Sequence, residues 1–234
     1  MGGLLTTVDS IGGVLAGLSV QPDWIVTTSM MATIAHLSHR GPLRSHARVL
    51  RRGRNAVVTG LDVVDEGNDD LPVAAVTMTS AVLDPGAMSL EFVRPVRSPM
   101  PPPVPDPQTP EEFFNIEPGE GLLTRLHLAD RLRNPWGILH GGAVATLVDV
   151  AACRAVAAVR DGADGDPRGG EPAVGLAAGD TVIHYLRPAR VGPVEARCQV
   201  LGGRDGCTLV RVAVHDVGAA DRLVDLASVA VLDV

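Results

Sequence analysis

The feature that most constrains the fold is an internal repeat. The segment GGLLTTVD at residues 2–9 returns as GAVATLVD at 142–149, with a Thr and the final Val-Asp in the same places. Farther along, GPLRSHARVLRRGR at 41–54 returns as GPVEARCQVLGGR at 192–204, with Gly-Pro followed by Val-Leu at the same distance. Such a repeat predicts two copies of one structural unit, packed against each other.

A proline-rich segment separates the two copies. Residues 85–110 include the run PMPPPVPDP, whose prolines lack the backbone N–H that a helix interior or an inner strand requires. We therefore expect an extended connector between an N-terminal unit, residues 1–84, and a C-terminal unit, residues 111–234.

Within each copy the hydrophobic pattern predicts the same order of elements. A proline-free apolar run, clearest at residues 142–159, indicates a buried helix. Stretches that alternate apolar and polar residues follow it, among them TVIHYL, VEARCQVL and TLVRVAVHDV, and they predict a four-stranded antiparallel meander. The fold class is thus α+β, with residues 121–128 as a further strand before the second helix.

The first copy has no counterpart of that leading strand. Met1 aligns with Gly141, so the Asn and the His that precede the second helix are also unmatched in the first copy. The sequence is consistent with a start codon placed too far downstream or with a truncated gene.

Composition narrows the class of protein. Hydrophobic residues make up 46% of the chain and charged residues 20%, which is typical of a globular protein. The formal net charge of −7 argues against a broad nucleic-acid surface. The three cysteines show no CxxC spacing, and the apolar N-terminus lacks a basic segment and carries Asp9. We therefore expect a cytoplasmic protein without a signal peptide or membrane anchor.

The stretch NPWGILHGGAVATLVD at residues 134–149 carries the clearest functional signal. Its Asn-Pro-x-Gly-x-x-His-Gly-Gly motif and the acid nine residues past the His resemble the hotdog-fold acyl-CoA thioesterases. The match is to the branch of the phenylacetate pathway and human thioesterase superfamily member 2. The segment HYLRPA at 184–189 is also similar to the strand that follows the family's helix.

This resemblance implies two tandem hotdog units, each a long central helix wrapped by an antiparallel sheet, the first lacking its N-terminal strand. It also implies a site formed between paired units, an acyl-CoA substrate, no metal and no cofactor other than the coenzyme A of that substrate. A homo-oligomer, a dimer of such chains, is expected, with neither nucleic acid nor membrane as a partner.

The motif also has a chemical interpretation that does not depend on the family. The first N–H groups of a helix are unpaired and carry partial positive charge. Gly141 and Gly142 have no side chains to obstruct a substrate carbonyl there, so they are candidates for an oxyanion hole. His140 would orient the carbonyl or the loop, and Asn134 would hold a water or the ligand.

Asp149 does not fit the same site. It lies seven residues past Gly142, roughly 10 Å along a helix axis, whereas a general base acts within about 3 Å of its water. A second helix must bring its own acid, and the repeat supplies Asp9 at the equivalent position. The expected working site therefore combines residues 134–141 with Asp9, as general base or nucleophile. A second, degenerate site would pair Asp149 with the start of the first helix.

Two further sets of residues are candidates. The resemblance places a Ser or Thr on the strand after the helix, beside the acid. Aligning AHL at 35–37 with HYL at 184–186 selects Ser29 in the first copy and Ala178 in the second, and a two-residue shift selects Thr27 on the same strand face. The arginines of the RRGR cluster would receive coenzyme A phosphates or simply form a charged hairpin tip: Arg51, Arg52 and Arg54.

Two other functions remain open at this point. A hotdog hydratase or dehydratase would carry a different motif, which is not legible in this sequence. A non-catalytic acyl-CoA-binding or regulatory protein is favoured by the missing first strand and by Ala178 in the second copy.

Overall fold

The computed structural model describes residues 1–84, 108–160, 162 and 175–234. Most of the proline-rich segment 85–110 therefore lies outside the described residues, and its expected extended conformation stays a prediction.

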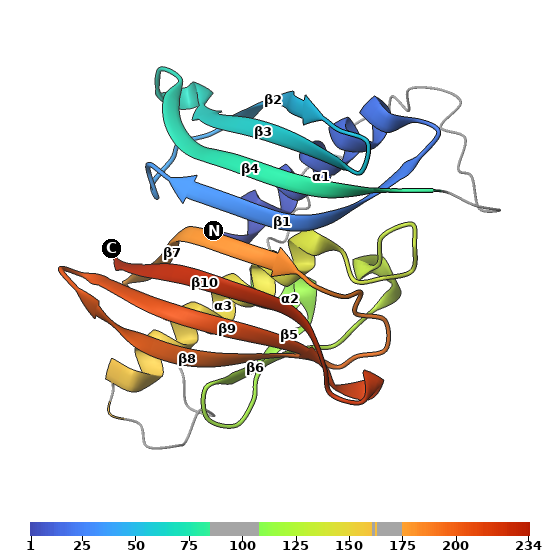
Figure 1. Cartoon of the computed structure of the whole chain (residues 1–234). Helices are drawn as coiled ribbons and strands as arrows, with labels where there is room; N and C mark the ends of the chain where they lie inside the picture. Colours follow the sequence, from blue (N-terminus) through green and yellow to red (C-terminus); the bar gives the residue numbers. More distant parts are fainter. Residues whose placement is uncertain (85–107, 161, 163–174) are drawn as a thin grey trace.

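A helix followed by four strands occurs twice along the chain (Figure 1). The N-terminal half contains α1 (Gly2–Val20), β1 (Trp24–Ile34), β2 (Leu43–Arg52), β3 (Ala56–Asp65) and β4 (Leu71–Leu83). The C-terminal half contains α3 (Gly141–Arg160), β7 (Leu176–Tyr185), β8 (Val194–Arg204), β9 (Cys207–Asp216) and β10 (Arg222–Asp233).

Additional elements precede α3: α2 (Pro110–Phe114), β5 (Ile116–Pro118) and β6 (Leu123–Leu126). The strand predicted at residues 121–128 is confirmed by β6. In the segment from residue 1 to residue 84, α1 is the first element.

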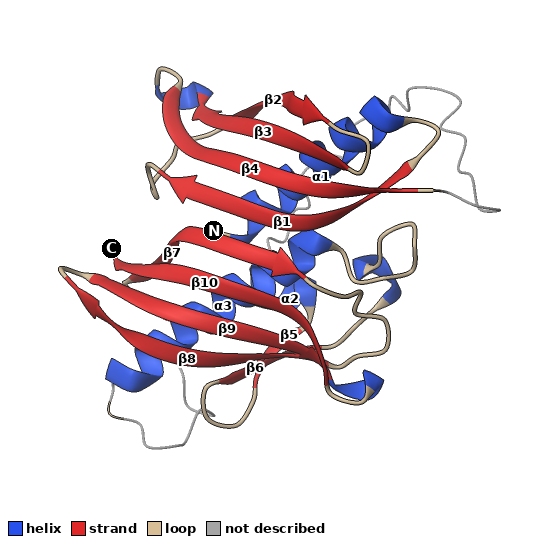
Figure 2. Cartoon of the chain, in the orientation of Figure 1, coloured by secondary structure: helices blue, strands red, loops and turns tan. Residues whose placement is uncertain are grey.

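All the strands form one antiparallel sheet in the order β2-β3-β4-β1-β7-β10-β9-β8-β6-β5 (Figure 2). The two halves join in the middle, where β1 pairs with β7 and Met30 lies opposite Ile183. The predicted strands are confirmed, but a simple meander is wrong. In each half the first strand pairs with the last, β1 with β4 and β7 with β10. Alternation of apolar and polar residues sets which face of a strand is buried but not which strand is its neighbour.

The core lies between the helices and one face of the sheet, as Figure 2 shows. Leu5 of α1, Leu147 of α3 and Ile183 of β7 are all fully buried there. Each such side chain contributes roughly 1.5–3 kcal/mol through burial. Both helices are long and apolar enough to cross a membrane by length and composition alone. The packing of α3, most of which is buried inside the protein, accounts for its apolar character.

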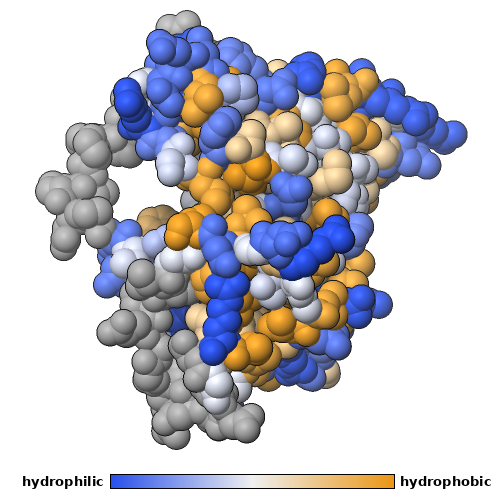
Figure 3. All heavy atoms as spheres, turned by 90° about the vertical axis from the view of Figure 1, so that its left-hand side faces the viewer, coloured by the Kyte–Doolittle hydropathy of each residue, from blue (hydrophilic) through white to orange (hydrophobic). Residues whose placement is uncertain are grey.

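The molecular surface shows the junction of the halves from outside. Seen from the left-hand side of Figure 1, hydrophobic residues lie across the middle and lower parts of the molecule, and the upper end is mostly hydrophilic (Figure 3).

The first turns of α1 and α3 run side by side in opposite directions at very close range. A Cβ added to Gly142 would lie 2.6 Å from the Thr6 Cα, and one added to Gly2 would lie 2.7 Å from the Thr146 Cα. At the crossing, the Thr6 and Thr146 hydroxyls are 3.0 Å apart. Because backbone atoms cannot move aside cheaply, this approach requires glycine at both helix starts.

Substitution of Gly142 by Ala tests this crossing. The added methyl group must push α1 away from α3, so we expect the free energy of unfolding to fall by about 1–3 kcal/mol, measured by urea denaturation. Gly3→Ala is the control, because a Cβ there meets nothing within 4 Å, and Ala is the better helix former. Equal destabilisation by the two variants would contradict the packing described here.

Candidate active site

Asp9 is the acid that the fold brings to the start of α3. The Gly142 N–H donates to Asp9 Oδ2 at 2.9 Å, and the Thr27 hydroxyl lies 3.4 Å from Oδ1. His140 Nδ1 lies 3.3 Å from Oδ2. The side chain comes from the other helix and from a position more than 130 residues away, as the rise of the helix requires.

The surroundings of Asp9 alter its basicity. Only 6% of the residue is exposed, and burial raises the pKa of Asp9 above its ordinary value, while His140, the Gly142 N–H and Thr27 partly offset that rise. A carboxylate that is costly to keep charged takes up a proton more readily. This environment therefore suits a general base.

His140 contacts Asp9 and is the more exposed of the two, with 32% of its side chain accessible to solvent. Its Nδ1 is 3.0 Å from the Gly142 N–H, and its Nε2 is 3.5 Å from the Ser10 hydroxyl of α1. A neutral Nδ1 accepts from Gly142, whereas a protonated Nδ1 faces the Asp9 carboxylate. His140 thus links α1 to the first turn of α3 in either state.

Gly141 offers a free donor beside that carboxylate. Its N–H donates to no residue in the part of the chain that the structure describes, although it stands at the first position of α3. A Cβ at this position would lie 2.9 Å from Asp9 Oδ2. An unpaired helix N–H next to a buried acid is the arrangement expected of an oxyanion hole and its base.

Tyr185, the last residue of β7, is a part of the site that sequence reasoning missed. Its hydroxyl donates to the Gly141 carbonyl oxygen at 3.1 Å. Burial raises the pKa of Tyr185, and the charges of Asp9 and Asp225 add to the rise. It is the single Tyr of the chain and lies within HYLRPA, which was a usable signal.

The two halves can be aligned residue by residue from the end of their first strands. The N–H groups of residues 35 and 36 both donate to the Val73 carbonyl, and those of residues 186 and 187 both donate to the Val224 carbonyl. The structural offset is therefore 151 positions, 186 − 35 and 224 − 73.

This offset corrects the position of the hydroxyl. Thr27 corresponds to Ala178, so the two-residue shift considered in the sequence is the right alignment and Ser29 is the wrong residue. Ser29 does not share the face of Thr27, because a β-bulge between the two residues interrupts the alternation of side chains along β1. Beyond it Met30 is buried and Met31 is 51% exposed, so Ser29 shares the outer face with Met31.

Asn134 has a structural task in its loop. Its Oδ1 accepts hydrogen bonds from the N–H groups of Trp136 at 3.0 Å and of Ile138 at 3.3 Å, which is an Asx turn. The residue lines the cavity described below, but its side-chain oxygen is turned toward its own loop.

Asp149 lies at the other end of the helix pair. The Gly2 N–H donates to its Oδ2 at 2.6 Å, so Asp149 meets the start of α1 as Asp9 meets the start of α3. The cavity that contains Asp9 does not include Asp149.

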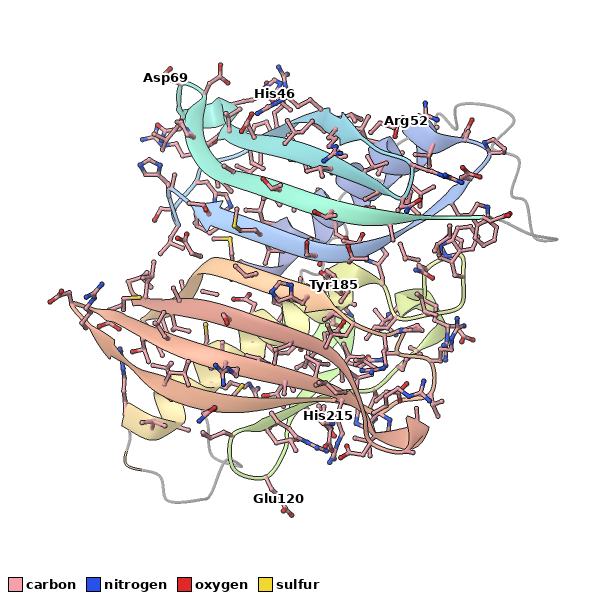
Figure 4. The ribbon with its side chains drawn as sticks, in the orientation of Figure 1. His46, Arg52, Asp69, Glu120, Tyr185 and His215 are labelled. Atoms are coloured by element: carbon pink, nitrogen blue, oxygen red, sulfur yellow. The ribbon has the colours of Figure 1, made fainter. Side chains whose placement is uncertain are left out.

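The arginine cluster is not brought to the site. Arg51, Arg52 and Arg54 are exposed at the β2–β3 hairpin and do not line the cavity. Figure 4 shows Arg52 on the N-terminal half, at a distance from Tyr185. The interpretation as a charged hairpin tip agrees with this placement.

A cavity of about 660 Å³ is lined by Asp9, His140, Gly141 and Tyr185, among others. Its walls come from α1, the start of β1, the loop at residues 134–141 and the segment at residues 185–190. Trp24 and Trp136 both line it, and their rings stack with centroids 3.4 Å apart. Its size is that of a small-molecule site. Among the described residues, no group of three or more His, Cys, Asp or Glu side chains could hold a metal ion.

The comparisons with known proteins bear on this arrangement. Residues 137–218 match the family model of the thioesterase superfamily. The match covers 82 of the 234 residues. The matched segment begins just before the start of α3 and includes Tyr185. No curated protein matches the chain in sequence.

Solved structures of thioesterases are similar over nearly the whole chain. A Lactobacillus plantarum protein named as an oleoyl thioesterase is 11% identical, with 98% of this chain and 89% of that chain covered and a TM-score of 0.62. The acyl-CoA thioesterase II TesB2 from Mycobacterium marinum is 14% identical, with 98% and 88% covered and a TM-score of 0.58. The 12:0-ACP thioesterase from Umbellularia californica is 10% identical, with 93% and 76% covered and a TM-score of 0.58. These likenesses show that the fold is the hotdog thioesterase fold.

The burial of Asp9 leads to a prediction about stability. Since its pKa is raised in the folded protein, the folded state favours the protonated acid, and stability is lost as the pH rises through the folded pKa. Asp9→Asn should therefore raise the midpoint of thermal unfolding at neutral pH, and the gain should shrink as the pH falls toward the unfolded pKa. Asp69→Asn, at an exposed turn, is the control. A lower unfolding midpoint for Asp9→Asn than for the wild type at neutral pH would contradict the raised pKa of Asp9.

Proposed function

We propose that this protein hydrolyses the thioester of a fatty or aromatic acyl-CoA at a composite site, to which α1 contributes Asp9 and α3 contributes His140 and Gly141. One observation carries the proposal. In the wall of a largely apolar cavity, the buried Asp9 carboxylate of one helix accepts the Gly142 N–H of the other helix. It lies beside Gly141, whose N–H donates to no described residue.

The reaction follows from these groups. The thioester carbonyl oxygen would accept the Gly141 N–H, which stabilises the negative charge that develops there. Asp9 would take a proton from a water as that water attacks the carbonyl carbon. Collapse of the tetrahedral intermediate breaks the carbon–sulfur bond and expels the coenzyme A thiolate. The thiolate takes up the proton held by Asp9, and a carboxylic acid remains. We assign Asp9 the role of general base, which its raised pKa suits.

Three neighbours would keep these groups in position. Thr27 contacts the second oxygen of Asp9, and the Tyr185 hydroxyl holds the Gly141 carbonyl, which fixes the first turn of α3. Arg187 and Arg190 line the cavity and are exposed. They would meet the phosphates of the thiol carrier in place of the more distant Arg51, Arg52 and Arg54.

The fold suggests how such a composite site arises in one chain. We propose that residues 1–84 and 111–234 are two fused hotdog units, with residues 85–110 as their connector. The support is the repeated order of one helix and four strands and the pairing of β1 with β7 at the centre of the sheet.

The other end of the helix crossing, at Asp149, would be a site that does not work. Asp149 contacts the Gly2 N–H, but the positions equivalent to Thr27 and Tyr185 hold Ala178 and Ile34. The residue equivalent to Gly141 is Met1, which brings a side chain to the helix start.

Paired acid variants test the site assignment. We expect Asp9→Asn to lower kcat by about 10²- to 10⁴-fold, the usual contribution of a general base, while Asp149→Asn stays close to the wild type. The measurement is release of free thiol from a panel of acyl-CoAs and from lauroyl-ACP. Loss of activity in Asp149→Asn but not in Asp9→Asn would reverse the assignment. Binding without thiol release from any substrate would make the protein a non-catalytic binder.

The pH profile provides an independent test. Since Asp9 acts in its charged form and its pKa is raised, kcat/KM should fall as the pH drops through a midpoint above that of an ordinary Asp. This acidic limb should disappear in Asp9→Asn, whose residual rate should be flat over the same range. A wild-type rate that stays constant down to the ordinary Asp pKa would rule out Asp9 as the base.

A further inference from the structure

Asp225 is a buried acid that the proposed reaction does not use. It lies on β10, next to Tyr185 in the pairing with β7, and is 2% exposed. Its side chain lines the cavity that contains Asp9. Among the described residues, no hydrogen-bond donor and no cation contacts its carboxyl group.

The other fully buried acids of the sheet have partners, which makes Asp225 an exception. Asp65 accepts hydrogen bonds from the N–H groups of Arg40 and Gly41, and Asp216 accepts them from the N–H groups of residues 190–192. A buried polar group without a partner is destabilising. Burial accordingly raises the pKa of Asp225 well above its ordinary value.

The equivalent position in the N-terminal half is apolar. With the offset of 151 positions, Asp225 corresponds to Ala74, which is buried in the core, and its neighbour Tyr185 corresponds to Ile34. The fold therefore does not need an acid at this point. The acid occurs in the half where the position faces the cavity.

The place of Asp225 indicates which part of a ligand it would meet. Paired residues of neighbouring strands lie about 5 Å apart, and Tyr185 contacts Gly141, where the thioester carbonyl would bind. Asp225 is thus paired with the residue that contacts the expected binding position of the thioester carbonyl. The rest of the wall nearby is largely apolar, including Leu139, Val144 and Leu186.

We propose that Asp225 is a specificity-determining residue that binds a hydroxyl group on the acyl chain, so that hydroxyacyl thioesters are the preferred substrates. A hydroxyl is the chemical group that fits, since it both donates and accepts and so pairs with either form of the carboxyl group. This inference rests on the proposed thioesterase activity.

Matched substrate pairs test the inference. Octanoyl-CoA is compared with 2-, 3- and 8-hydroxyoctanoyl-CoA, which differ from it by one hydroxyl group each. For the wild type we expect at least one hydroxy isomer to have a kcat/KM about 10- to 100-fold above that of octanoyl-CoA, the effect of one buried hydrogen bond to a carboxyl group. In Asp225→Val that preference should vanish, while octanoyl-CoA is still hydrolysed.

Two variants serve as controls. Asp225→Asn keeps a donor and an acceptor and should retain most of the preference. Val229→Ala alters a buried side chain of the same strand outside the cavity and should leave the preference unchanged. Equal rates for all the substrates in the wild type, or the same preference in Asp225→Val, would overturn the role of Asp225 and leave the proposed hydrolysis intact.

If the wild type shows no hydrolysis, the binding of acyl-CoAs distinguishes the two proposals. Calorimetric titration of Asp9→Asn with octanoyl-CoA and with the hydroxy isomers measures the Asp225 contact without turnover. If the wild type releases no thiol but Asp9→Asn binds a hydroxy isomer at least tenfold more tightly, and Asp225→Val removes that difference, the hydrolysis proposal fails and the Asp225 contact stands. If binding also shows no difference, both fail.

Discussion

The close crossing of α1 and α3 is the interaction on which the rest of the structure depends. Glycine at each helix start lets the backbones approach so closely that an added Cβ would lie 2.6 or 2.7 Å from a Cα of the other helix. At this separation the acid two turns into one helix reaches the first N–H groups of the other, as Asp9 reaches Gly142. A wider crossing would take from each acid its hydrogen bond to a glycine N–H of the other helix, which is costly.

The two ends of this crossing have the same geometry but different chemistry. Both pair an aspartate with a glycine N–H, at 2.9 Å for Asp9 and 2.6 Å for Asp149. The end at Asp9 also has His140, Thr27 and Tyr185 around it, and it opens into the cavity. The aspartate–glycine hydrogen bond, which both ends share, therefore holds the two helices together. The surrounding side chains decide which end can bind and react with a substrate.

Much of this arrangement could be predicted from the sequence. The repeat predicts two helices with equivalent acids, and a rise of about 1.5 Å per residue makes it impossible for Asp149 to serve its own helix start. The alternation of apolar and polar residues locates strands that follow the second helix, among them β7, β8 and β9. None of this requires knowledge of the tertiary structure.

The remaining features depend on tertiary contacts that local patterns do not record. The pairing of the first strand with the last is one such feature, because alternation gives the face of a strand and not its neighbour. The bulge after Thr27 is another, and it moves Ser29 to the outer face. In the sequence, Asp225 looks like an ordinary polar residue of a strand. Its burial in the wall of the cavity becomes visible only in the folded structure, where the sheet covers α3.

The most direct test of the composite site is a crystal structure of Asp9→Asn bound to an intact acyl-CoA. The account predicts that the thioester carbonyl oxygen accepts the Gly141 N–H within hydrogen-bond distance, with the side chain at position 9 facing the carbonyl carbon. A thioester bound at the start of α1 beside Asp149, or one that does not contact Gly141, would contradict it.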